Sequence, residues 1–161
     1  MKLAEEWFKT EQVKFGASAN AKSLNAAAEK GNAYHRKVYK LLAMQMKISS
    51  QLQGWELIVE PWFRGRDSRR LCSPDTVLLN REAGIALVVE VKLNWADGKD
   101  DKLLEKYLPV VECAFKVKAY PCMVVQNLRG YKGPEPLKGL MSIWEALKWN
   151  AAKPTPVAMV L

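Results

Sequence analysis

The strongest constraint on the fold is a stretch of two apolar segments joined by a polar turn, residues 73–92. The segments, 75–80 and 85–92, are short and rich in Val, Leu and Ile, and the residues between them include Asn and Gly. This pattern predicts a β-hairpin. Because its second segment is apolar on both faces, we expect that strand to lie in the middle of a sheet.

Three charged side chains, Asp75, Glu90 and Lys92, stand at the open end of this hairpin. Glu90 and Lys92 are two residues apart, so they share one face of their strand. The carbonyl of Val91 lies in the strand plane and can also reach a cation. Charges placed this deep need compensation, and a divalent cation, which prefers oxygen ligands, would supply it. Lys92 is then suited to orient a water molecule or to stabilise charge during phosphoryl transfer.

Apolar periodicity and helix-breaking residues outline the rest of the chain. Gly31 and Pro109 each interrupt a helical pattern and are expected to kink or divide it. The strand–helix–strand passage over residues 85–126 predicts a right-handed parallel crossover. We expect helices over residues 1–15, 21–52, 99–118 and 139–150, strands over 55–60, 121–126 and 157–161, and loops over 62–73 and 130–136.

These elements predict an α/β fold, a mixed central β-sheet flanked by helices on both sides. The length of 161 residues suits one domain, residues 1–161, with its core at about 30–127. His35, the single histidine, shares a helix face with Tyr39 and Leu42, because steps of three and four residues return to the same side. It therefore points inward, where both a core histidine and a metal ligand fit.

The net charge of +8 attracts polyanions, so nucleic acid is the first partner to consider; a solvated basic surface is the alternative. The three cysteines include no CxxC pair and are typical of a reduced intracellular setting. The first residues lack an apolar signal core, and no apolar run is long enough for a membrane span. A cytoplasmic location without membrane contact is expected.

Pro74-Asp75 and Glu90-Val91-Lys92, at hairpin spacing, resemble the motif of the PD-(D/E)XK nuclease superfamily. The resemblance implies a restriction-endonuclease-like fold and a phosphodiesterase that depends on Mg²⁺ or Mn²⁺. It also implies that Asp75 and Glu90 bind the metal and that Lys92 assists the attacking water.

The segment from Gly31 to His35 is similar to the Gly-x-x-x-His element of RecB-like nucleases, which implies that His35 is a further metal ligand. That branch also carries a glutamine four residues before a tyrosine on the next helix. Tyr107 matches the tyrosine and is a candidate catalytic residue, but Leu103 stands at the glutamine position. Lys102 is a candidate for phosphate contact instead.

The arginine-rich loop that leads into Asp75 is a candidate DNA contact, since arginines bind phosphates and neighbouring Trp62 and Phe63 can stack on unpaired bases. An ordinary solvated loop is the alternative. Glu29 and Glu60 are candidates for an additional acid, with a surface role as the alternative. The arginines are Arg64, Arg66, Arg69 and Arg70.

The function expected from these features is a metal-dependent DNA nuclease, an exonuclease or a structure-selective endonuclease of DNA replication, recombination or repair. The alternatives are a catalytically inactive nucleic-acid-binding module of the same fold and an interaction subunit of a replication or recombination assembly. Homo-oligomers would suit an enzyme that cuts two strands.

Overall fold

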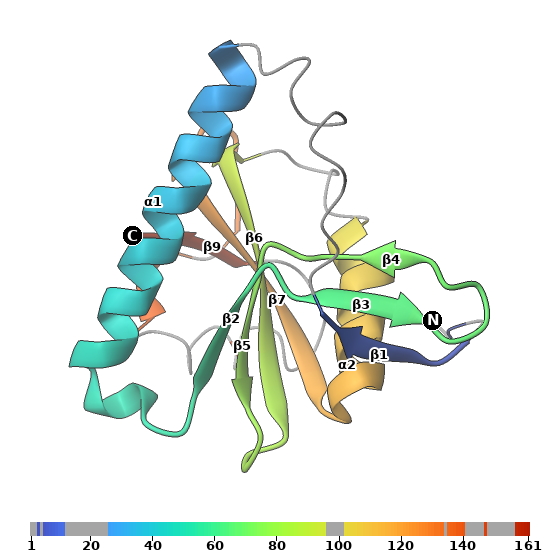
Figure 1. The fold of residues 1–161 in the computed structure, drawn as a ribbon. Coiled ribbons are helices and arrows are strands. Elements are labelled where there is room, and N and C mark those ends of the chain that lie inside the picture. Colours follow the sequence, from blue (N-terminus) through green and yellow to red (C-terminus); the bar gives the residue numbers. More distant parts are fainter. Residues whose placement is uncertain are drawn as a thin grey trace.

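The computed structural model describes residues 3, 5–11, 26–95, 102–133, 135–140, 147 and 157–161, with the backbone alone for 26–30. Two sheets and two main helices make up this part of the chain (Figure 1). In chain order the elements are β1 (Trp7–Thr10), α1 (Ala26–Ile48), the 3₁₀ turn η1 (Ser50–Leu52), β2 (Glu56–Val59), β3 (Trp62–Gly65), β4 (Leu71–Cys72), β5 (Thr76–Asn80), β6 (Ile85–Asn94), the π-helical turn η2 (Leu103–Tyr107), α2 (Leu108–Phe115), β7 (Lys118–Asn127), β8 (Leu137–Lys138) and β9 (Val157–Val160).

The larger sheet has six strands in the order β2-β5-β6-β7-β9-β8. The pairs β2–β5 and β5–β6 are antiparallel, whereas β6–β7, β7–β9 and β8–β9 are parallel. The predicted mixed sheet is therefore confirmed, as are the central position of β6 and its parallel pairing with β7.

Helices cover both faces of this sheet, as predicted (Figure 1). Successive strand residues point to opposite faces, so Leu87 and Val89 of β6 join a core cluster with Leu42 of α1. Ala86 and Val88 lie on the other face, in a second cluster to which η2 and α2 contribute.

The β5–β6 hairpin forms at the predicted position because its turn is locally encoded. Asn80 Oδ1 accepts a hydrogen bond from the Ala83 amide at 3.0 Å. Gly84 has φ of 68°, a left-handed conformation that glycine adopts without steric cost. All five residues of β5 are buried, so a one-residue shift in register would move each side chain into the opposite core cluster.

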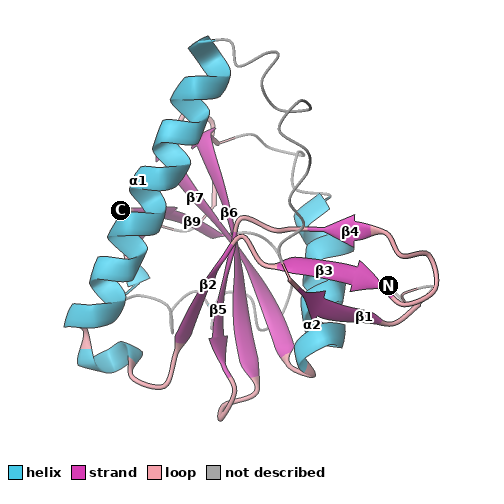
Figure 2. Cartoon of the chain, in the orientation of Figure 1, coloured by secondary structure: helices cyan, strands magenta, loops and turns pink. Residues whose placement is uncertain are grey.

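Two predictions for the first half of the chain are wrong. The described part of residues 1–15 contains strand β1, not a helix, and the expected loop over 62–73 contains β3 and β4. These strands form a separate antiparallel sheet in the order β1-β3-β4 (Figure 2). Trp7 is buried beside Phe63 in one core cluster. Pairing between distant segments thus decides the structure of a short stretch whose local pattern also fits a helix.

The helix predictions are partly confirmed. α1 runs through Gly31 without the expected division, and a Cβ at that glycine would meet no atom within 4 Å outside the adjacent turns of the helix. The predicted helix over 99–118 is described from Lys102 on, and it changes from η2 to α2 next to Pro109, which stands in the first turn of α2. Most of the predicted helix over 139–150 lies outside the described residues, and the two-residue β8 was not predicted.

Candidate active site

Asp75 and Glu90 meet at the open end of the β5–β6 hairpin. The register places Thr76 opposite Val89, so the two acids are the next residues along the strands. The Asp75 amide donates to Glu90 Oε1 at 3.1 Å, and the Val91 amide donates to Asp75 Oδ2 at 2.7 Å. The hairpin therefore holds both carboxylates at one point on the sheet.

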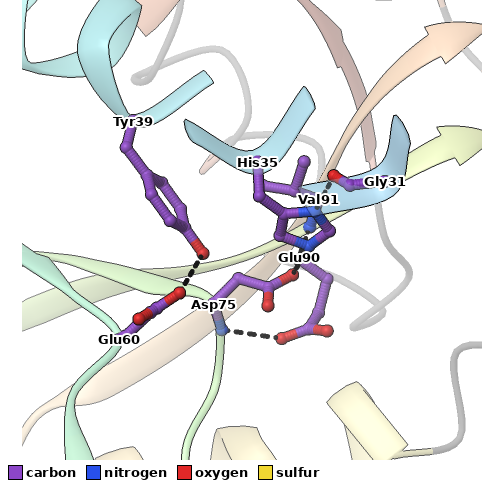
Figure 3. A network of polar contacts seen from close by, with 7 residues as sticks. All are labelled: Gly31, His35, Tyr39, Glu60, Asp75, Glu90 and Val91. Atoms are coloured by element: carbon purple, nitrogen blue, oxygen red, sulfur yellow. Dashed lines mark hydrogen bonds and ion pairs between the residues drawn. The ribbon is translucent and has the colours of Figure 1, made fainter. Parts of the chain in front are cut away.

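His35 reaches this point from α1 (Figure 3). Its Nε2 lies 3.3 Å from Asp75 Oδ2, and its Nδ1 lies 2.8 Å from the carbonyl oxygen of Gly31. Because a carbonyl oxygen can only accept, Nδ1 carries a hydrogen and Nε2 faces the carboxylate. The hydrogen bond with Asp75 raises the pKa of His35, although burial opposes this.

The surroundings of Glu90 disfavour the negative charge of its carboxylate. Burial raises its pKa to about 7, and the negative charge of Asp75 acts in the same direction. The hydrogen bond from the Asp75 amide and the charges of Lys92 and Lys102 oppose the shift without cancelling it. A cation close to both acids would allow both to be ionised at neutral pH.

The donor atoms of this site suit Mg²⁺ or Mn²⁺, which prefer oxygen ligands. The described hydrogen bonds and ion pairs engage Oδ2 of Asp75 and Oε1 of Glu90, so the second oxygen of each acid has no partner there. The Val91 amide points toward Asp75, and in an extended strand the carbonyl of the same residue faces the same edge. With Nδ1–H bound to Gly31, the Nε2 lone pair of neutral His35 is suited to coordination.

The side chains that would bind the ion are nevertheless not arranged around a common point. No group of three or more His, Cys, Asp or Glu side chains in the described residues is arranged to hold an ion. His35 and Asp75 contact each other directly, at 3.3 Å. A bound ion would have to replace this contact, so the donor set fits in chemistry and requires a local adjustment of side chains.

Lys92 and Tyr107 both lie near the acids. Lys92 is exposed, and its charge lowers the pKa of Glu90 and of His35. Tyr107 is 5% exposed, and Lys102 Nζ lies 5.3 Å from the centre of its ring. Burial raises the pKa of Tyr107, and the charge of Glu90 contributes. Leu103, at the position of the expected glutamine, is buried in the core.

The structure places the predicted arginines in the β3–β4 hairpin of the smaller sheet. Arg64 lies in β3, opposite Leu71 of β4, and the hairpin continues from there to its turn. Arg66, Arg69 and Arg70 therefore lie in or next to that turn, which extends away from the large sheet (Figure 1). The contact of these arginines with DNA stays a prediction.

The carboxylates of Glu5 and Glu6 bind the turn between β3 and β4. Glu5 Oε2 accepts hydrogen bonds from the amides of Asp67 and Ser68, each at 2.7 Å, and Ser68 Oγ also donates to the Glu5 carboxylate. Arg66 Nη1 lies 3.0 Å from Glu6 Oε2. The positive charge of Arg66, which was a candidate for phosphate binding, is thus paired with a carboxylate of the same protein.

The sequence did not mark Tyr39 as part of the site, since its position four residues after His35 also fits a core residue. The Tyr39 hydroxyl donates to Glu60 Oε1 at 3.4 Å, and the rings of Tyr39 and His35 meet edge to face at 6.2 Å (Figure 3). Burial and nearby acids raise the pKa of Tyr39 far above its usual value. The other candidate acid, Glu29, has no described side chain.

Glu60 lies beside Asp75 because its amide donates to the Asp75 carbonyl at 2.8 Å. Its φ of 47° is left-handed, which costs about 1–3 kcal/mol in a residue other than glycine. This strained backbone directs the carboxylate toward Tyr39, so Glu60 is a third acid at the edge of the site.

Neither a protein-family model nor a curated protein matches this chain. Within the described residues, each helix is too short or too polar to cross a lipid bilayer.

Proposed function

We propose that this protein is a phosphodiesterase that depends on Mg²⁺ or Mn²⁺ and cleaves DNA. The observation that carries the proposal is the meeting of Asp75, Glu90 and His35, with Lys92 on the same strand face as Glu90. The resemblance of these residues to the PD-(D/E)XK motif and its RecB-like branch supports the same reaction.

The residues have separate roles in this proposal. Asp75, Glu90, the Val91 carbonyl and His35 would hold the ion, which when bound would act as a Lewis acid and ease deprotonation of water. The ammonium group of Lys92 would orient the attacking water or stabilise negative charge on the phosphate.

DNA is the proposed substrate because the chain carries a net charge of +8, and Lys92 and Lys102 lie near the acids. Exonuclease activity and structure-selective endonuclease activity are both compatible with an acid site at the end of a hairpin. A cytoplasmic location is part of the proposal, since a reduced compartment that holds DNA suits three free cysteines.

The direct test is cleavage of fluorescently labelled DNA, single-stranded and duplex, with Mg²⁺, with Mn²⁺ and with a chelator. We expect cleavage only with metal, and a loss of about 100-fold or more in rate for Asp75→Asn and for Lys92→Ala. Glu82→Gln is the matched control, because Glu82 is an exposed acid in the turn at the other end of the same hairpin. Equal rates for Asp75→Asn and the control would overturn the assignment.

Leu103, in place of the expected glutamine, favours the second candidate, a nucleic-acid-binding module without catalysis. The same samples separate the two functions. DNA binding without cleavage under either metal would support the module and contradict the nuclease.

A further inference from the structure

The helical turn η2 lies against the sheet face that carries Glu90 and Lys92. Alternate residues of a strand point to the same face, so Glu90 and Lys92 share the face of Val88 in β6. Val88 packs in one buried cluster with Tyr107 of η2. The residues of η2, and Lys102 directly before it, are therefore neighbours of the acids.

Tyr107 positions the ammonium group of Lys102. The Nζ atom of Lys102 lies 5.3 Å from the centre of the Tyr107 ring, and a hydrogen bond with the Tyr107 hydroxyl raises the pKa of Lys102. The charge of Lys102 opposes the rise that burial causes in the pKa of Glu90, so the ammonium group interacts with the acid site. The Lys102 side chain is exposed. Since an ammonium group has three N–H donors, those not used by Tyr107 can bind a ligand.

Lys106 extends this positive charge along η2. It follows Lys102 by four residues, so the two side chains lie on the same side of a helical turn. The Nζ atom of Lys106 lies 6.0 Å from the centre of the Trp7 ring. Burial raises the pKa of the Cys72 thiol to about 11, and the charges of Lys106 and Lys102 oppose the rise. Both lysines therefore lie near Cys72, three residues before Asp75 in the chain.

Lys92, Lys102 and Lys106 form a row of positive charge beside the acids, called the lysine row below. Lys92 and Lys102 both border Glu90, and Lys102 and Lys106 both border Cys72, which gives the order of the row. The ion pairs between described residues include none of the three lysines. Because neighbouring ammonium groups repel one another, an anionic ligand would stabilise the row.

The row ends at a cavity of about 660 Å³ next to Lys106. Arg70 is the second cation of its lining, but the acids Glu5, Asp67 and Glu105 also line it. Three carboxylates against two cations disfavour a further phosphate there. We therefore expect the phosphates of a polyanion to lie along the lysine row and not in the cavity.

We propose that the lysine row binds the phosphates of a nucleic-acid strand on one side of the acid site, so that the strand runs along η2. Contacts between lysines and phosphates position a strand without reading its bases, so this contact is independent of sequence. The place of the cleaved phosphate at Asp75 and Glu90 rests on the proposed function, whereas phosphate binding by the row does not.

The first test is the salt dependence of binding of a labelled single-stranded DNA, measured by fluorescence anisotropy with a chelator so that cleavage plays no part. Each lysine that neutralises a phosphate contributes about 0.7 to the slope of log affinity against log salt concentration. Lys102→Ala and Lys106→Ala should each lower the slope by about this amount. Lys118→Ala is the control, because Lys118 is exposed and lies beside Ile85, at the other end of β6. Slopes of the variants equal to that of the control would overturn the proposal.

Two further measurements guard against misfolded variants. Lys102→Arg and Lys106→Arg keep the positive charge and should keep the slope; a slope as low as that of the alanine variants would overturn the role of charge. In the unaltered protein, bound single-stranded DNA should protect Lys92, Lys102 and Lys106, but not Lys118, from acetylation, as read by mass spectrometry. Equal protection of Lys118 and the row would overturn the proposed path.

The same samples separate this proposal from the proposed function. A protected lysine row without cleavage under Mg²⁺ or Mn²⁺ would support the path of the strand and count against the nuclease alone. Metal-dependent cleavage with an unprotected lysine row would count against the path alone.

Discussion

The amide of Val91 donates a 2.7 Å hydrogen bond to Oδ2 of Asp75, so the backbone of one strand holds the acid of its neighbour. The amide of Asp75 in turn donates to Glu90. This reciprocal arrangement keeps two carboxylates close together even though they repel each other. The cost of that repulsion leads to the first prediction.

Glu90→Gln should make the metal-free protein more stable, by about 0.5–2 kcal/mol, since it removes a partly buried charge next to Asp75 and keeps an oxygen that can accept from the Asp75 amide. Urea denaturation in the presence of a chelator measures this. The exposed Glu82→Gln should have little effect. A clear loss of stability in Glu90→Gln would show that the carboxylate is not under electrostatic strain.

Mn²⁺ should stabilise the unaltered protein against thermal unfolding, because an ion that binds the folded state alone shifts the equilibrium by about 2.7 kcal/mol at a concentration of 100 times its dissociation constant. We expect no such shift in Asp75→Asn, which keeps the shape of the side chain but loses its charge. Calorimetry at increasing Mn²⁺ concentration provides a readout that does not depend on cleavage. An equal shift in Asp75→Asn would place the ion elsewhere.

Stability should fall in acid partly through Glu5. Hydrogen bonds from Ser68 hold the pKa of Glu5 below its usual value of 4.5. Since the unfolded chain then binds the proton more tightly, the contribution of Glu5 is complete above pH 4.5 and is lost as pH falls through the lower pKa of the folded state.

Glu5→Gln tests this contribution. The variant should have a lower urea midpoint than the unaltered protein at about pH 7 and a smaller decrease on acidification to about pH 3. Glu6→Gln is the matched control, since the Glu6 side chain is 67% exposed in its pair with Arg66. Parallel pH profiles of Glu5→Gln and the unaltered protein would contradict the role of the turn contacts.

Phe63→Ala should destabilise the protein by about 3–5 kcal/mol, because the Phe63 ring is fully buried and meets Phe115 of α2 edge to face at 5.7 Å. Trp62, its neighbour in β3, is only partly buried. Trp62→Ala should therefore cost less in the same denaturation experiment. Similar losses for the two variants would mean that β3 is not anchored through Phe63.

Local patterns in the sequence predicted the centre of this fold. The apolar runs and turn residues of the β5–β6 hairpin act between close neighbours, so they define the strands and bring Asp75 and Glu90 to the same end. The helical face of α1 likewise predicted that His35 points inward, and the structure finds it against Asp75. Here the sequence determined both the elements and the positions of the main residues of the candidate site.

Tertiary structure decided the features that depend on distant partners. β1 is a strand because β3 supplies its hydrogen bonds, although the local pattern also fits a helix. The contact of Tyr39 with Glu60, and the packing of Trp95 and Tyr131 against β7 and β9, arise from packing and strand order, which no local spacing encodes. The physical reason is that backbone hydrogen bonds and core packing between remote segments outweigh the weak local preferences of short stretches.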